Sequence, residues 1–324
     1  MKKTLSILLL LALVLCLGSC GKQQKPETDT VRIASLKGPT SMGLVQLYSR
    51  ADNNELGYKV EYQLCGSADE ITPLLASGQL DMAAIPANLA AMLYNKQTDI
   101  TVAAVNTLGV LYVLETGNSI HSVADLKGKT VYSTGKGTTP QHALEYLLQQ
   151  NGLDPEQDLT VEYLSEATQV AAMLAAPAAD AVAVLPQPFV TSAMAGNEAL
   201  RVALSFAEEW RIASGGGELL TGVLVVNRTF AQNNPELVAQ FLADYALSAA
   251  YTETNAEEAA ALIEQYGILP KAAVALKALP HCGITLLTGE EMQSALSAYL
   301  QTLYDRNTAA VGGAMPEDDF YYGA

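Results

Sequence analysis

Short apolar segments alternate with amphipathic ones along the first third of the chain. Patterns typical of strands cover residues 31–36, 58–64, 81–85 and 100–105. Helical spacing follows the first three of them, up to about residues 51, 76 and 94. A strand, a loop, a helix and another strand recur in this order, which predicts a parallel sheet built from βαβ units.

The next part of the chain repeats this pattern. After an almost continuous apolar strand over 109–115, strands are predicted over 129–132, 159–164, 180–185 and 200–206, with helices over 141–150 and 167–175. Residues 75–81 resemble residues 174–180, and both lead into an alanine-rich strand ending in a hydrophobic–proline pair, Ile85-Pro86 and Leu185-Pro186. This internal repeat predicts two similar α/β lobes.

The last third reads as one more strand and then helices. The strand covers 219–227, and the helices cover 235–250, 256–266, 272–276 and 290–303. We expect residues 31–115 and 220–324 to form lobe 1, with the helical C-terminal part packed on it, and residues 116–219 to form lobe 2.

Two glycine-containing loops stand out, Leu36 to Gly43 and Ser133 to Pro140. In the second, Thr139 is a candidate N-cap and Pro140 suits a first helical position. Such a helix start, with small hydroxyl side chains, can hold an oxyanion or another acceptor, and a plain strand-to-helix turn is the alternative. The loop is neither a Walker A site, because Gly137 follows Lys136, nor a dinucleotide fingerprint, because Pro140 replaces the third glycine.

The N-terminus has the pattern of an export signal. Lys2 and Lys3 precede an apolar run over 5–15, and Leu-Gly-Ser-Cys ends at Cys20. This order resembles the lipobox of bacterial lipoproteins, which implies that residues 1–20 are a signal peptide and that Cys20 is lipidated. A secretory signal with a chance cysteine is the alternative. The polar residues 21–30 read as a flexible tether.

Charge and cysteines narrow the class of protein further. Lys plus Arg number 18 against 34 for Asp plus Glu, a net charge of −16, which argues against nucleic acid and a polybasic membrane-binding surface. Cys65 and Cys282 are expected to be separate buried thiols. The chain has no Cys-x-x-Cys or Cys/His cluster, so we expect no metal and no cofactor.

Taken together, these segments resemble the type II periplasmic binding proteins. Within them the chain is similar to the solute-binding components of ABC importers for sulfonate, nitrate and thiamine precursors. The similarity extends over residues 31–322 and lies in the order and spacing of several motifs rather than in any one. The motifs cover residues 36–43, 66–70, 125–130, 134–140, 185–188 and 311–313. Gln187 departs from the family, which often has an acidic residue between the two prolines.

The resemblance implies a mechanism. Residues 111–117 and 219–226 would cross between the lobes, and Gly117 and Gly222 could absorb a hinge rotation. A small organic solute would bind in the cleft and pass to an ABC permease and its ATPase. The protein would be a monomer held outside the cytoplasm by its lipid anchor, and not an enzyme.

Ligands of open α/β sheets lie beyond the carboxyl ends of the strands, which selects loops 36–43, 65–68, 86–88, 133–139 and 186–188. Lys37 and Lys136 could pair with an anionic group or be solvated loop lysines, and Trp210 could stack on a flat solute or pack at the hinge. Because no arginine falls in these loops, a neutral or weakly anionic solute is favoured. The candidate ligand-binding residues are Lys37, Gly38, Thr40, Ser41, Met42, Gly66, Ser67, Asn88, Ser133, Lys136, Thr138, Thr139, Gln187 and Trp210.

Two other functions fit the same resemblance. Pyrimidine-precursor synthases that resemble these binding proteins use a histidine and closely spaced cysteines, but His121, His142 and His281 are isolated and no cysteine run is present. A solute-sensing lipoprotein would share the fold and the ligand without the permease. Neighbouring genes for a permease and an ATPase would separate sensing from import.

Overall fold

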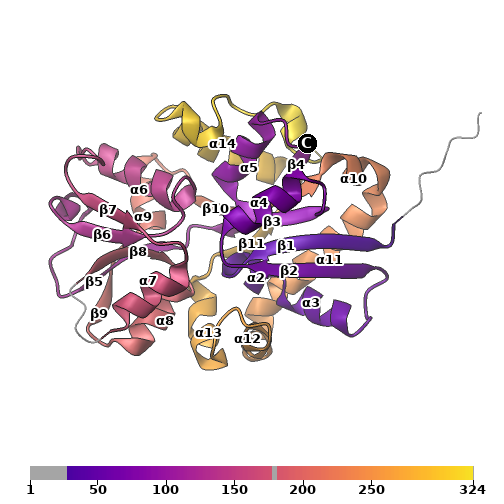
Figure 1. The fold of residues 1–324 in the computed structure, drawn as a ribbon, viewed down its shortest axis with the longest axis horizontal. Helices are drawn as coiled ribbons and strands as arrows, with labels where there is room; N and C mark the ends of the chain where they lie inside the picture. Colours follow the sequence, from indigo (N-terminus) through magenta and orange to yellow (C-terminus); the bar gives the residue numbers. More distant parts are fainter. Residues whose placement is uncertain (1–27, 177–180, 324) are drawn as a thin grey trace, which may run out of the picture.

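The structure, a computed structural model, describes residues 28–176 and 181–323. The predicted signal peptide, Cys20 and the tether up to residue 27 lie outside them. Within these ranges, no helix is both long and apolar enough to cross a membrane. The chain forms two sheets, each covered by helices on both faces, which confirms the predicted α/β class with two lobes (Figure 1).

Six strands form the sheet of the first lobe, in the order β11-β4-β10-β3-β1-β2. β1 runs parallel to β2 and β3, whereas β10 runs antiparallel to β3 and β4. The short edge strand β11 was not predicted. The strand bounds are β1 Thr30–Leu36, β2 Lys59–Cys65, β3 Met82–Pro86, β4 Ile100–Leu108, β10 Leu220–Asn227 and β11 Ile284–Leu287.

Alternating side chains of this sheet enter different apolar clusters. Val31 and Ile33 of β1 pack with residues of α3 and α11, and Ala34 packs with α4, α5 and α14 on the other face. Helix α12 lies beside α11 and contacts α13, which also contacts α8 of the second lobe (Figure 1). The helix bounds are α2 Pro39–Met42, α3 Val45–Asp52, α4 Ala68–Ala76, α5 Ala87–Asn95, α10 Arg228–Asn233, α11 Pro235–Thr254, α12 Ala256–Gln265, α13 Ala272–Ala278 and α14 Gly289–Tyr304, with the 3₁₀ helices η2 Leu279–His281, η3 Thr308–Val311 and η4 Asp318–Phe320.

Five strands form the second sheet, in the order β7-β6-β8-β5-β9. β6 is parallel to β7 and β8, and β5 is antiparallel to β8 and β9. The strand bounds are β5 Leu111–Thr116, β6 Thr130–Ser133, β7 Thr160–Tyr163, β8 Val182–Pro186 and β9 Leu200–Ser205. The helix bounds are η1 Val123–Leu126, α6 Thr139–Gln150, α7 Ala167–Leu174, α8 Phe189–Gly196 and α9 Phe206–Ala213.

The chain passes between the sheets at two places, residues 109–110 between β4 and β5 and residues 214–219 between α9 and β10. β5 therefore belongs entirely to the second sheet, which differs from the expected boundary of lobe 1 at residue 115. Neither predicted hinge glycine lies at a crossing. Gly117 follows β5, and Gly222 is paired inside β10, where an added Cβ would lie 2.5 Å from Asn106 Oδ1.

One ion pair anchors β5 to β9. The Glu115 carboxylate, 1% exposed, accepts hydrogen bonds from the backbone N–H groups of Ser119 and Ile120, from the Ser119 hydroxyl and from the Arg201 guanidinium. Burial alone would raise the pKa of Glu115, but these donors together hold it below its ordinary value of 4.5.

Glu115→Gln is therefore expected to lower the free energy of unfolding by about 3 kcal/mol at pH 7, because Arg201 loses a buried partner. Since the folded pKa is depressed, this stabilisation is complete above the unfolded pKa and is lost as the pH falls through the folded pKa. Urea unfolding of both proteins should show the difference at pH 7 and a smaller one below about pH 4. An equal difference at both pH values, or a similar cost for the exposed Glu162→Gln, would contradict this role.

Candidate functional site

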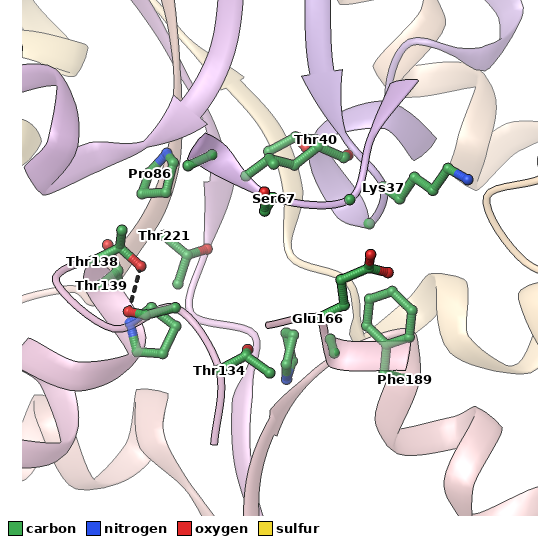
Figure 2. A pocket seen from close by; sticks show the side chains of 18 of the residues that line it. Lys37, Thr40, Ser67, Pro86, Thr134, Thr138, Thr139, Glu166, Phe189 and Thr221 are labelled. Carbon is green, nitrogen blue, oxygen red and sulfur yellow. Dashed lines mark hydrogen bonds between the residues drawn. The ribbon is translucent and has the colours of Figure 1, made fainter. Parts of the chain in front are cut away.

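A cavity of about 380 Å³ lies between the two sheets. The carboxyl ends of the parallel strands β1, β2, β3, β6, β7 and β8 open onto it, and β5 and β10 begin beside it. Its wall consists of residues 36–40, 66–69, 86, 107, 110–111, 134–136, 138–140, 163–167, 186, 189 and 221. Both predicted glycine-containing loops thus contribute to one cavity, one from each lobe (Figure 2).

The first lobe contributes the start of α2 and the start of α4. Gly38 has a φ of 149°, a conformation that glycine adopts readily, and leads into Pro39 at the start of α2. The Thr40 hydroxyl donates to the Leu36 carbonyl over 2.8 Å. Lys37 is exposed, and Figure 2 shows its side chain extending away from the threonines of the cavity.

Helix α4 is capped from within. Ser67 is its N-cap, and the Glu70 carboxylate accepts hydrogen bonds of 2.9 Å from the backbone N–H groups of both Gly66 and Ser67. Glu70 thus engages the N–H groups of the two residues that precede α4, whereas the N–H groups of Ala68 and Asp69 in its first turn do not donate to it.

The second lobe contributes the loop between β6 and α6. Gly135 and Gly137 have φ values of 69° and 78°, which only glycine adopts without strain. The Thr138 hydroxyl donates to the Gly135 carbonyl over 2.7 Å and closes the turn. Helix α6 begins at Thr139, so Thr138 is the N-cap, one residue before the predicted position.

The structure brings together part of the predicted set. The residues of that set that line the cavity are Lys37, Gly38, Thr40, Gly66, Ser67, Lys136, Thr138 and Thr139. Those that do not line it are Ser41, Met42, Asn88, Ser133, Gln187 and Trp210.

The second group is buried behind the wall, and the polar side chains of Ser41, Asn88 and Gln187 hold loops in place. The Ser41 hydroxyl donates to the Leu36 carbonyl, and the Gln187 side chain accepts from the Thr191 hydroxyl. Ser133 and Met42 are fully buried. The Asn88 side chain donates to the carbonyls of Gly137 and Ala310.

The structure contradicts the placement of Trp210 in a loop beside the ligand. Phe206 and Trp210 are spaced by one helical turn, and both are buried on one face of α9. Trp210 is 1% exposed, with its ring centroid 4.4 Å from that of Tyr146 and 5.5 Å from that of Tyr299. Burial of this large ring between α6 and α14 removes it from the cavity.

The loop after β7 was missing from the predicted site, although it also follows the carboxyl end of a parallel strand. It supplies Glu166, which is exposed and accepts from the Thr168 hydroxyl over 2.9 Å. A Cβ added to Gly66 would lie 3.0 Å from the Glu166 carboxyl carbon, so the side chain reaches the opposite lobe. Tyr163 and Phe189 contribute aromatic rings to the wall of the cavity. Burial is the main cause that raises the pKa of Tyr163, and the nearby Glu145 carboxylate adds to it.

Within the residues that the structure describes, Cys65 and Cys282 do not form a disulfide. Cys65 and Cys282 are both free and buried, as predicted. Burial raises the pKa of each thiol, and at Cys65 the Glu70 carboxylate adds to this effect. Both side chains are therefore kept as neutral thiols.

Two α/β lobes with a solute-sized cavity between them define the class of two-lobed periplasmic binding proteins. The model of the family described as "ABC transporter, phosphonate, periplasmic substrate-binding protein" matches residues 53–274. The chain belongs to this family, and it is the periplasmic substrate-binding component of an ABC transporter. A comparison with curated proteins gives no match.

Solved structures share the fold over most of the chain. An ABC transporter protein from Parabacteroides distasonis is 24% identical, with a TM-score of 0.74, 90% of this chain covered and 98% of the other. The alkanesulfonate-binding protein from Xanthomonas axonopodis, bound to MOPS, is 19% identical, with a TM-score of 0.70 and coverages of 90% and 96%. The nitrate-binding protein from Synechocystis is 13% identical, with a TM-score of 0.65 and coverages of 88% and 85%.

Proposed function

We propose that the protein, acting as a monomer, captures one small organic solute in the cavity between its lobes, does not transform it, and delivers it to the permease. The observation that supports this is the meeting of parallel strand ends from both sheets around about 380 Å³, a volume within the range of small-molecule sites. The residues proposed to contact the solute include Lys37, Thr40, Ser67, Lys136 and Thr138, to which we add Glu166.

We infer that the lobes divide at residues 109–110 and 214–219, where the chain passes between the sheets. Residues 31–108 and 220–323 would move as one lobe, and residues 111–213 as the other. Closure about these two connections would bring the loops around Thr40 and Thr138 onto the solute from opposite sides.

Solute capture predicts that the purified mature protein gains thermal stability with one solute class from a metabolite panel. A ligand at one hundred times its Kd stabilises the folded state by about 2.7 kcal/mol. Differential scanning fluorimetry measures the shift, and isothermal titration calorimetry of each hit gives the stoichiometry. Conversion of the hit by the protein alone, followed by mass spectrometry, would favour an enzyme and contradict this proposal.

We also propose that Cys20 carries the lipid that holds the protein on the outer face of the cytoplasmic membrane, on the strength of the Leu-Gly-Ser-Cys order. Cys20→Ala should move the protein from the membrane fraction to the soluble fraction of cells, as immunoblots of both fractions would show. Cys16→Ala, inside the signal, is the matched control and should leave the protein with the membrane. Equal partitioning of the Cys20 variant and the wild type would contradict lipidation.

The family description and the solved neighbours name phosphonate, alkanesulfonate and nitrate, which are oxyanions. An oxyanion is bound by hydrogen-bond donors. The donors and acceptors in the wall of the cavity therefore decide which class of solute it can bind.

A further inference from the structure

Four charged side chains line the cavity, and each lobe supplies one of each sign. Lys37 and Asp69 come from the first lobe, and Lys136 and Glu166 come from the second. All four are exposed, and within residues 28–176 and 181–323 none has an oppositely charged side chain within 4.0 Å. Charges that can pair between the lobes are therefore present on both sides of the cavity.

Lys37 and Glu166 lie at the end of the cavity that opens outward. Together with Gly66, they line both the cavity and a second hollow of about 490 Å³, here called the outer groove. The outer groove is lined by residues 37, 64, 66, 70, 166, 168, 264 and 267–270. Figure 2 shows Lys37 and Glu166 at the end of the cavity opposite Thr138 and Thr139. The two side chains thus mark one end of the cavity, one from each lobe.

The backbone places Lys37 beside Gly66, and the Glu166 side chain reaches the same point from the other lobe. In the parallel pairing of β1 with β2, Leu36 lies opposite Cys65, and the Lys37 N–H donates to the Cys65 carbonyl over 2.8 Å. Adjacent strands are about 4.8 Å apart. A Cβ added to Gly66 would lie 3.0 Å from the Glu166 carboxyl carbon, so glycine at this position leaves room for the carboxylate. The flexible four-carbon stem of Lys37 can therefore bring its ammonium group to Glu166.

Two further carboxylates of the outer groove determine what Lys37 does there. Glu70 and Glu264 both belong to the first lobe, and each already accepts from the backbone, Glu264 from the Ala272 N–H over 2.8 Å. Pairing of Lys37 with either of them would not connect the lobes. Their charges repel Glu166 as the lobes approach one another, and the charge of Lys37 offsets this repulsion.

We propose that Lys37 and Glu166 form an ion pair between the lobes that closes the outer end of the cavity, also in the absence of solute. This goes beyond the proposed function, because it assigns the two side chains a role in closure that does not depend on the identity of the solute. The methylene groups of Lys37 can still contact the solute while Glu166 holds its charge.

The test measures the distance between the lobes in the mature protein without solute. Glu61→Cys on β2 and Glu162→Cys on β7 place one nitroxide label on each lobe, at exposed positions outside the cavity and the outer groove. Cys20→Ala removes the thiol of the predicted lipidation site, and Cys65 and Cys282 are buried. Double electron–electron resonance then gives the ratio of short to long distances between the labels.

At about 50 mM NaCl this ratio should be about two- to fivefold higher with native Lys37 and Glu166 than in Glu166→Gln, the effect of one exposed ion pair. Lys37→Gln should lower the ratio further, because like charges then meet in the outer groove. In the Lys37→Gln background, Glu166→Gln should raise the ratio instead, since it removes that repulsion. NaCl at about 1 M, where the Debye length is about 3 Å, should remove these differences.

Glu156→Gln is the matched control. Glu156 is an exposed acid of the second lobe in the connection from α6 to β7, outside the cavity and the outer groove, so its loss should leave the ratio unchanged. An equal ratio in Glu166→Gln and the native pair at low salt would overturn the ion pair. So would the same fall on Glu166→Gln with and without Lys37. Solute binding is measured separately, so failure of the ion pair leaves the proposed function standing, and failure of every solute leaves the ion pair standing.

Discussion

Replacing Trp210 by alanine is expected to lower the free energy of unfolding by about 3–5 kcal/mol. The ring is 1% exposed and packs against Tyr146 of α6 and Tyr299 of α14. Its removal would leave a cavity where the second lobe meets the C-terminal helices of the first, and rigid helices on both sides would limit collapse. Urea unfolding of the mature protein measures the loss.

Solute binding separates this structural role from the stacking role considered for Trp210 in the sequence. Trp210→Phe keeps an aromatic ring in the core, so it should cost less stability than alanine and leave the Kd of the solute within about twofold of the wild type. Because Trp210 is the only tryptophan, its emission should also be that of a buried indole, and saturating solute should leave the emission wavelength unchanged. A large loss of affinity in the phenylalanine variant would place the ring at the ligand.

Much of the cavity could be predicted because it depends on local rules. Parallel strands recognised from apolar periodicity fix where their carboxyl ends meet, and the loops around Thr40, Ser67 and Thr138 all follow such ends. The same rule applied to the strand over residues 160–163 selects the loop of Glu166. That loop was missed because it has neither the glycines of the loops at 36–43, 65–68 and 133–139 nor the prolines of the loops at 86–88 and 186–188.

Side-chain direction and bonding could not be predicted in the same way. Asn88 and Thr138 both lie at helix starts in the selected loops, yet one faces inward to distant carbonyls and the other lines the cavity. Which partner each finds depends on segments far away in the chain, such as Ala310. The commitment of the threonine hydrogens is likewise a property of the folded loops rather than of composition.

The sequence also could not assign β5 to one of the two sheets. The apolar residues of β5 fit a buried strand in either lobe, since periodicity describes a strand's faces and not its neighbours. Only its pairing with β8 and β9 assigns it to the second sheet. That pairing moves the crossing to residues 109–110, away from both glycines first considered as hinges.

Among residues that do not line the cavity, replacing Asn88 by alanine is expected to weaken solute binding the most. It is fully buried on α5, and its side-chain nitrogen donates to the carbonyls of Gly137 in the second lobe, over 3.3 Å, and Ala310, over 3.1 Å. Asn88→Ala would leave both carbonyls without this donor, at a cost of about 2–4 kcal/mol in the free energy of unfolding. It would also free the loop that carries Lys136 and Thr138, so affinity should fall about tenfold or more.

Asn95 offers a matched control on the same helix. Its side-chain nitrogen donates to the carbonyls of Val311 and Ala314, both over 2.7 Å, and it does not line the cavity. Asn95→Ala should therefore lose stability, by about 1–3 kcal/mol, with the solute Kd unchanged within about twofold. Unfolding and calorimetry on both variants give the comparison. If the two variants lose affinity equally, the bond from Asn88 to Gly137 does not hold the binding loop in place.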